Sequence, residues 1–321
     1  SVDEPTLNLF NQGMLHKDNF VMSKSRGNVV SQEEIANRYG IDTARFFLSF
    51  VASPDKDMEW DDKGVEGSFR FLNKFYNLYS KKMTNKTIKK QESKLQKTIK
   101  EVTTNIENFR YNLALISIME FANYLNSQDE INKDVAEKFI LLLAPFTPHL
   151  CEELWEKIGN KPFISMEKWP EYDEKKFDIK LEAQDAVIEK TISDIRAVLE
   201  IIKIEKPKKI SLIVSSVWKY GLFSKIKEKM TETRNIGEII RSVMDKDHAK
   251  EISDLVPKLV KNPSRIPAEI IDQKTELKGL ESGKDAFTKA FGCEIEIVKA
   301  EDSTEQKAKQ AMPSKPTIIV S

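Results

Sequence analysis

Apolar residues separated alternately by three and four positions recur through most of this chain, and that spacing predicts a mainly helical protein. A long helix is expected to begin after Asp61, which would cap it. Its apolar face comprises Val65, Phe69, Leu72, Tyr76 and Tyr79. A second apolar seam comprises Leu95, Ile99, Val102, Ile106, Phe109, Leu113 and Ile116. Both seams predict core residues that face neighbouring helices.

Two further helices are predicted before residue 160. The first breaks near Pro145, and its apolar positions are Val135, Phe139 and Leu142. The second is expected to start at Thr147-Pro148, an N-cap residue followed by a proline at the first helical position, and to end at Gly159. Four helices with short connections predict an antiparallel bundle. Residues 161–177 have no helical period and are expected to cover it, anchored by Phe163, Trp169 and Pro170.

The residues before the bundle predict shorter elements. Gly13 to Val21 has the pattern of a small hairpin that turns at Lys17-Asp18-Asn19. Ser31 and Glu34 form a capping box for a short helix that ends at Tyr39-Gly40. Asp42 is expected to cap the next helix, from Thr43 to about Ala52.

The last third of the chain changes character. A helix from Leu181 to Ile204 carries an apolar seam of Ile188, Ile192, Ile195, Leu199 and Ile202. Alternating apolar residues then predict strands at 210–214, 293–297 and 317–320, with helices at 219–229, 236–244, 249–260 and 282–291. The expected fold is therefore mainly α with a small C-terminal α/β domain. Its expected divisions are a loop-bearing segment (1–60), the helix bundle (61–180) and the linking helix with the α/β domain (181–321).

Composition narrows the class of protein. The 321 residues include 51 basic and 51 acidic ones, so a nucleic-acid surface would have to come from local patches. Only two cysteines occur, Cys151 and Cys293, and both are expected to be buried. They allow neither a disulfide framework nor a zinc site, and no metal site is predicted; this cysteine usage fits a reducing cytosol. No apolar run reaches the length of about 18 residues that a membrane span needs.

The strongest candidate for chemistry is the stretch Met22-Ser-Lys-Ser-Arg-Gly-Asn28, which lies between the hairpin and the helix that follows Ser31. A cationic, hydroxyl-rich loop before a helix N-terminus suits a polyphosphate ligand. Lysine carries a compact charge on a flexible stem, so Lys24 can follow phosphate oxygens during a reaction. A solvated turn is the alternative interpretation.

This loop resembles the K-M-S-K-S signature of class I aminoacyl-tRNA synthetases. Tyr39–Arg45 is similar to the helix entry that follows this loop in the leucine, valine and isoleucine enzymes. Met58–Gly67 and Arg70–Asn73 resemble leucyl-tRNA synthetases in particular, and Leu143–Trp155 resembles the anticodon-binding bundle of the group. The tail that ends at Lys315–Val320 is similar to the C-terminal extension of archaeal leucyl-tRNA synthetases.

Two departures from the family pattern stand out. Val21 replaces the first lysine of the signature, which leaves Lys24 as the main charge directed at phosphate. The other ATP motif of the family, H-x-G-H, does not occur, because the only histidines are His16, His149 and His248. We therefore expect the nucleotide-binding sheet, the amino-acid pocket and the editing domain to lie upstream, and the chain to be a fragment or subunit that is inactive by itself.

The resemblance implies ATP-dependent activation of leucine and its transfer to tRNA(Leu) in the cytoplasm. Lys24 would be the catalytic residue and Met22, Ser23, Lys24 and Ser25 the ATP-binding residues. Mg²⁺ would accompany ATP and be bound largely outside this chain. The long variable arm of the tRNA is the expected partner of the C-terminal domain, with Lys206, Lys208 and Lys209 as candidate contacts. The intact protein would be a monomer, or a heterodimer if naturally split.

Three alternatives remain open. The first is a valine- or isoleucine-specific synthetase, which Glu59-Trp60 and Val65–Gly67 argue against. The second is a non-catalytic tRNA-binding module with a vestigial loop. The third is a helical scaffold whose seams pair with a partner. A lysine-rich stretch, 81–100, is either a tRNA-contacting surface or a solvated helix joint.

Overall fold

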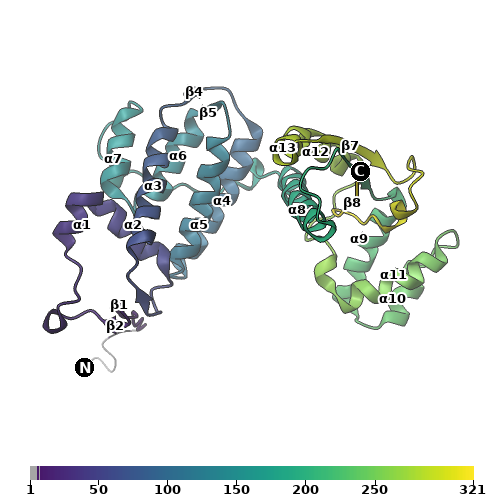
Figure 1. Cartoon of the computed structure of the whole chain (residues 1–321), viewed down its shortest axis with the longest axis horizontal. Helices are drawn as coiled ribbons and strands as arrows, with labels where there is room; N and C mark the ends of the chain where they lie inside the picture. The colour runs from purple at the N-terminus through teal and green to yellow at the C-terminus, as the bar shows by residue number, and fades with distance from the viewer. Residues whose placement is uncertain (1–5, 7) are drawn as a thin grey trace. The chain divides into compact units, whose positions relative to one another are not determined.

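The computed structural model describes residues 6 and 8–321, and the chain forms two compact units, 1–177 and 178–321 (Figure 1). The described residues contain thirteen α-helices and three small sheets, so the fold is mainly α, as predicted.

A three-stranded sheet opens the N-terminal unit. The predicted hairpin forms from β1 (Leu15–Lys17) and β2 (Phe20–Val21), and β3 (Met58–Glu59) pairs with β1 in parallel. Asp18 and Asn19 have φ of 59° and 64°, which is the turn geometry that suits a two-residue hairpin loop. At Gly13 an added Cβ would lie 2.0 Å from the carbonyl oxygen of Lys56. The backbone beside the hairpin therefore requires glycine at this position.

Two short helices follow the loop. The helix α1 (Gln32–Tyr39) is capped by Ser31, whose Oγ accepts a hydrogen bond of 3.4 Å from the N–H of Glu34, as predicted. The next helix, α2 (Ile41–Val51), begins before Asp42, so the prediction that Asp42 caps it is wrong. Asp42 lies inside the first turn, and its carboxylate is directed to a different helix.

The bundle contains α3 (Asp62–Leu78), α4 (Lys89–Glu107), α5 (Tyr111–Asn126), α6 (Lys133–Leu143) and α7 (Pro148–Lys157). Asp61 caps α3 through the N–H groups of Lys63 and Gly64, as predicted. Short parallel strands, β4 (Lys82–Thr84) and β5 (Glu130–Asn132), join the connections. The fully buried centre includes Phe75, Leu95, Leu115, Phe139 and Leu142, while α2 adds Phe46.

The single seam predicted from Leu95 to Ile116 is wrong in its second half. The chain turns between α4 and α5, where Phe109 has a φ of 56° and the side chain of Asn108 bonds to the carbonyl of Thr104. Leu113 and Ile116 are consequently about two-fifths exposed, at 41% and 40%. The buried face of α5 instead comprises Ala114, Leu115, Ile118, Phe121, Ala122 and Leu125. The bundle therefore has one helix more than the pattern predicted.

Two other apolar assignments also need correction. Phe163 is 63% exposed, and Ile164, which is buried, anchors the covering segment together with Trp169 and Pro170. On α3, Phe69 is 38% exposed, because the buried face is rotated toward Phe71, Phe75 and Leu78. Thr147 is the N-cap of α7 and Pro148 occupies the first helical position, as predicted, although the buried Thr147 side chain makes no capping hydrogen bond.

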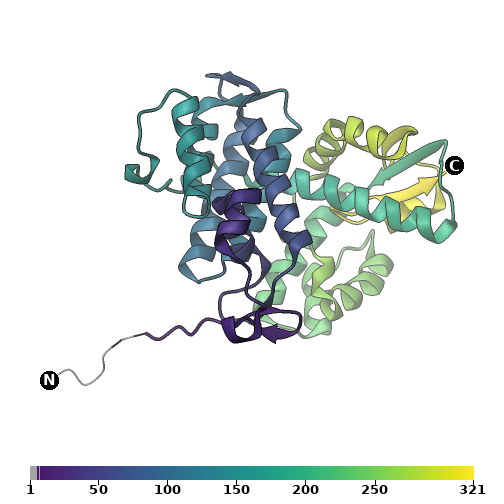
Figure 2. The same ribbon diagram turned by 60° about the vertical axis from the view of Figure 1, so that its left-hand side comes forward.

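The C-terminal unit contains a three-stranded sheet of order β7-β6-β8 (Figure 2). The central strand β6 (Lys209–Val214) runs parallel to β7 (Glu294–Lys299) and antiparallel to β8 (Thr317–Val320). The helices α8 (Ile179–Ile202), α12 (Gln273–Ser282) and α13 (Lys284–Phe291) share its core. On α8, Ile202 is 43% exposed and does not extend the predicted seam. The strands agree with the predictions, whereas α12 was not predicted.

A second core in this unit joins α9 (Val217–Glu232), α10 (Ile236–Val243) and α11 (Ala249–Lys261). This unit also contains a buried carboxylate. Glu276 on α12 is fully buried, and its Oε2 accepts hydrogen bonds from the Tyr220 hydroxyl at 2.9 Å and from the Ser314 N–H at 2.7 Å. Its other oxygen, Oε1, has no hydrogen-bond partner among the described residues.

Candidate functional site

The loop with the signature residues is a tight turn that closes on the hairpin. Lys24–Arg26 forms one turn of 3-10 helix, and Gly27 follows with a φ of 68°. The Gly27 N–H bonds to the carbonyl of Lys24 at 3.2 Å. The side chain of Asn28 then accepts a hydrogen bond of 2.9 Å from the N–H of Ser23, so residues 23 to 28 form a closed ring.

The side chains of the loop differ in how far they are engaged. The hydroxyls of Ser23 and Ser25 share a hydrogen bond of 2.8 Å. Arg26 lies over the Phe20 ring at 5.0 Å from its centre. Met22 packs against a small apolar cluster that contains Ile35, Phe47, Trp60 and Val65. Lys24 is exposed and makes no ion pair with the described residues, so its charge is available to an anion.

Asn28 is a site residue that the sequence pattern did not identify. Its Nδ2 lies 3.2 Å from the carbonyl oxygen of Lys17 and 3.4 Å from those of Phe20 and Val21. The residue type was the only signal, because asparagine at the end of a turn frequently bonds to nearby backbone groups. Three of these partners lie seven or more residues away, which local spacing could not indicate.

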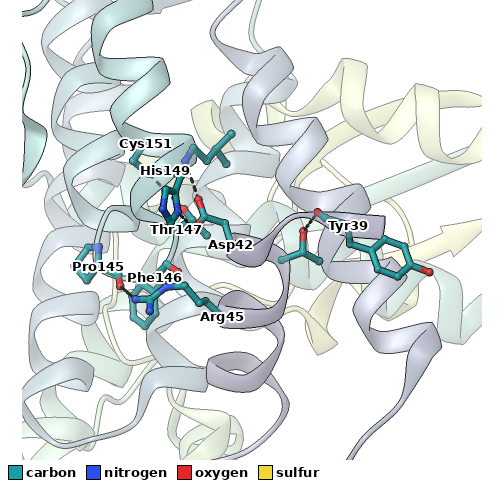
Figure 3. Close-up of polar contacts among 10 residues, drawn as sticks. Tyr39, Asp42, Arg45, Pro145, Phe146, Thr147, His149 and Cys151 are labelled. Carbon is teal, nitrogen blue, oxygen red and sulfur yellow. Dashed lines mark hydrogen bonds and ion pairs between the residues drawn. The ribbon is translucent and has the colours of Figure 1, made fainter. Parts of the chain in front are cut away.

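The helices behind the loop are fixed to the bundle by two side chains on one turn of α2 (Figure 3). Asp42, which is 7% exposed, accepts hydrogen bonds from the Leu150 N–H at 2.7 Å and from His149 Nδ1 at 2.9 Å. Arg45 donates to the carbonyls of Phe146 at 3.3 Å and Pro145 at 3.0 Å.

The two charges match the helix ends that they contact. An anion is favourable at a helix N-terminus and a cation at a C-terminus, because unpaired N–H and C=O groups lie there. Asp42 therefore complements the start of α7, and Arg45 complements the chain just after α6. The fold thereby links the helices that follow the loop to the corner between α6 and α7.

The candidate tRNA-binding lysines differ in their surroundings. Lys206 and Lys208 are exposed and make no ion pair with described residues. Lys209 lies on β6 and its Nζ is 3.1 Å from Glu296 Oε2, so the pKa of the Lys209 amine is raised by that carboxylate. The same contact and a hydrogen bond from Ser211 lower the pKa of Glu296. Lys209 is thus less available to a phosphate than its two neighbours.

Many lysines between residues 81 and 100 already have partners in the N-terminal unit. Lys81 donates to the carbonyls of Asn126 and Gln128, and Lys82 lies 3.1 Å from Glu130. Lys94 and Lys100 lie over the rings of Tyr124 and Tyr172, each at 5.1 Å from the ring centre. These contacts favour the interpretation of this stretch as a helix joint.

The remaining polar candidates have structural surroundings. Both cysteines are free and buried, as predicted, and burial raises the pKa of the Cys151 thiol to about 12. No group of three His, Cys, Asp or Glu residues that could hold a metal ion occurs in the described part of the chain. Among the described helices, none combines the length and apolar character needed to cross a lipid bilayer.

Comparison with known families identifies two segments. The family described as "tRNA synthetases class I (M)" matches residues 3–83, which include the loop and its supporting helices. The family described as "Anticodon-binding domain of tRNA ligase" matches residues 89–214, from α4 through β6.

Two relatives illustrate the similarity. The leucine–tRNA ligase of Petrotoga mobilis is 42% identical over 198 residues, covering 54% of this chain and 24% of the relative. That of Pyrococcus horikoshii is 32% identical over 321 residues, covering 93% of this chain and 33% of the relative. The chain thus spans a third or less of the length of these relatives.

A solved structure, the Agrobacterium radiobacter LeuRS-tRNA-LeuAMS ternary complex, aligns with 55% of this chain and 25% of its own chain. The TM-score is 0.49 and the sequence identity is 26%. The first family match covers the signature loop, and the second covers the helix bundle from α4 onward. The segment that carries the loop therefore matches the class I tRNA synthetases, and the chain is homologous to one part of the leucine–tRNA ligases.

Proposed function

We propose that this chain supplies the ATP-phosphate loop and the tRNA-binding part of a leucine–tRNA ligase. The observation that carries the proposal is the exposed, unpaired Lys24 at the tip of a closed turn, in a chain homologous to leucine–tRNA ligases. The proposed reaction is ATP-dependent activation of leucine followed by transfer to tRNA(Leu). By itself the chain is expected to bind tRNA weakly and to catalyse nothing, because it lacks an H-x-G-H motif.

In the activation step, a carboxylate oxygen of leucine attacks the α-phosphorus of ATP. A new P–O bond forms, the bond to the bridging oxygen breaks, and pyrophosphate leaves with the negative charge. The Lys24 ammonium stabilises that charge more strongly in the transition state than in bound ATP, and this difference accelerates the step.

The other loop residues are assigned smaller roles. Ser23 and Ser25 bind phosphate through their hydroxyls when the bond between these groups opens, and Met22 supports the loop by packing on the apolar cluster. No group of three His, Cys, Asp or Glu residues that could hold a metal ion occurs among the described residues, so the Mg²⁺ that would accompany ATP is assigned largely to residues outside this chain.

The proposed second partner is tRNA(Leu), with its long variable arm bound by the C-terminal unit. The match of residues 89–214 to an anticodon-binding domain supports a tRNA partner in general. Lys206 and Lys208 are the proposed phosphate contacts, since neither is paired with a described acidic residue. Such contacts position a nucleic acid without reading its bases. The proposed setting is a cytoplasmic ligase that is monomeric when intact, or heterodimeric if naturally split.

The test combines this chain with the remainder of the ligase and measures leucine-dependent pyrophosphate exchange. Lys24→Ala should lower the exchange rate by roughly 100-fold to 1,000-fold, the usual effect of losing one transition-state contact, with leucine affinity little changed. Lys63→Ala removes an equally exposed charge from α3 and serves as the control. An unchanged exchange rate in Lys24→Ala would refute the assignment.

The outcome also separates the rival functions. If the complemented chain binds long-arm tRNA but never supports charging, the non-catalytic module is correct. If charging requires valine or isoleucine in place of leucine, the specificity is wrong although the loop assignment stands. Indifference to RNA at low salt would favour the helical scaffold.

A further inference from the structure

Both polar atoms of the Asn28 amide are engaged at the base of the signature loop. Its Oδ1 accepts from the Ser23 N–H at 2.9 Å. Its Nδ2 faces the carbonyl oxygens of Lys17, Phe20 and Val21 at 3.2, 3.4 and 3.4 Å. The oxygen faces a donor and the nitrogen faces acceptors, so the pattern fits only an amide in this orientation.

These contacts tie Asn28 both to the hairpin and to the start of the loop. The carbonyl partners lie on the hairpin, whereas the N–H partner belongs to the residue directly before Lys24. Since Gly27 adopts a φ of 68°, the chain reverses and brings Asn28 back against the hairpin. The backbone on either side of Lys24 is thereby held in place even though the loop itself is exposed.

We infer that Asn28 is a positioning residue that acts through Lys24, by fixing the backbone from which its side chain extends. This inference rests on the proposed function. The lysine side chain is flexible, so the position of its ammonium group depends on where the main chain is anchored. A cation fixed near its place in the transition state stabilises the leaving group without a further ordering cost.

A purely structural role for Asn28 predicts a different pattern of defects. Adenylate formation and its reversal by pyrophosphate both involve charge on pyrophosphate, whereas in the transfer of leucine from preformed adenylate to tRNA the leaving group is AMP. A positioning defect should therefore slow the first pair of reactions and spare the transfer. A general loss of folding should slow all of them.

The decisive variant is Asn28→Asp, which preserves shape and the acceptor for Ser23 but replaces the donor with an oxygen facing three carbonyls. Asn73→Asp makes the same exchange at an exposed position on α3, where the amide bonds, among the described residues, only to the Phe69 carbonyl, and it serves as the control. Both are measured in the complemented ligase, beside Lys24→Ala and the double variant of Asn28→Asp with Lys24→Ala.

Asn28→Asp should lower kcat for pyrophosphate exchange about tenfold, the factor that corresponds to about 1.4 kcal/mol. The KM for leucine and the single-turnover transfer rate should stay within about twofold of the unaltered protein, since neither involves pyrophosphate. The double variant should be no slower than Lys24→Ala, because Asn28 acts only through that lysine.

Three results would overturn the inference: exchange within twofold of normal in Asn28→Asp, equal losses in exchange and transfer, or additive losses in the double variant. If Lys24→Ala leaves exchange intact, the proposed function of the loop fails instead. In that case amide hydrogen exchange at Ser23 still tests the tie. Asn28→Ala should accelerate hydrogen exchange of the Ser23 amide at least tenfold in the 321-residue chain. Equal hydrogen-exchange rates in the variant and the unaltered chain would refute the contact between Asn28 and Ser23.

Discussion

The backbone N–H of Leu150 donates a hydrogen bond of 2.7 Å to the carboxylate of Asp42, a residue 108 positions earlier in the chain. Asp42 thereby caps α7 from α2, at a helix start where Thr147 makes no capping bond. His149 supplies a second partner for the same carboxylate. One buried acid thus joins the segment behind the signature loop to the helix bundle.

Removing this cap should destabilise the N-terminal unit. Asp42→Ala leaves the Leu150 N–H without its acceptor, and we expect a loss of about 1–2 kcal/mol in the free energy of unfolding. Urea unfolding followed by circular dichroism measures the loss. Asp129→Ala, at an exposed position, is the control and should change stability by less than about 0.5 kcal/mol. Equal stability of the two variants would show that the cap contributes nothing.

Replacing Gly27 with a residue that has a side chain should strain the backbone of the loop and slow the reaction. An added Cβ would meet no atom within 4 Å, so any defect in Gly27→Ala arises from its φ of 68° and not from a clash. The left-handed conformation costs an alanine about 1 kcal/mol relative to glycine. We expect pyrophosphate exchange to slow severalfold in the complemented ligase. Gly27→Asn should recover part of the rate, because asparagine tolerates this conformation better; a slower Asn variant would contradict the explanation.

Glu276 should make the C-terminal unit less stable as the pH rises. Burial raises the pKa of this carboxyl from 4.5 to about 7, while hydrogen bonds from Ser314 and Tyr220 oppose the shift. Between these two values the folded chain holds a proton that the unfolded chain has released. The contribution of Glu276 to the free energy of unfolding is therefore greatest below about pH 4.5. It falls by about 3 kcal/mol in all as the pH rises through 7.

Glu276→Gln tests this dependence. The variant should be more stable than the unaltered chain at pH 8. Its free energy of unfolding should decline much less between pH 5 and 7 than that of the unaltered chain. Urea unfolding at several pH values, read from the resolved indole N–H resonance of Trp218 in NMR spectra, reports on this unit, because Trp218 is its one tryptophan. Glu281→Gln changes an exposed carboxyl on the same helix and should preserve the decline. A decline of equal size in both variants would rule out Glu276 as its source.

Salt dependence should distinguish the lysines at the start of β6. If Lys206 and Lys208 contact phosphate, each change to Gln should reduce the slope of log affinity against log salt by about 0.7–0.9. Lys209→Gln should reduce it less, because Glu296 already partners that amine. Filter binding of long-arm tRNA between low and moderate salt supplies the slopes. A larger effect at Lys209 than at its neighbours would contradict the assignment.

Elements fixed by neighbouring residues were predictable from the sequence. The caps at Ser31 and Asp61, the hairpin turn and the strands β6, β7 and β8 all agree with local patterns. Each depends on contacts within a few residues or on simple alternation of apolar positions. One misplaced assignment, the continuous seam through Phe109, occurred where the chain turns without a glycine or proline at the turn itself.

The sequence by itself determined the helical character of this protein, the loop that resembles the synthetase signature and the charge at Lys24. Only the tertiary structure decided that Asn28 ties the loop to its hairpin and that Asp42 serves α7 instead of its own helix. The spacing of residues along the sequence indicates which of them can share a helix face or a turn. It does not record which distant backbone N–H a carboxylate will meet, because packing of the whole unit brings those groups together.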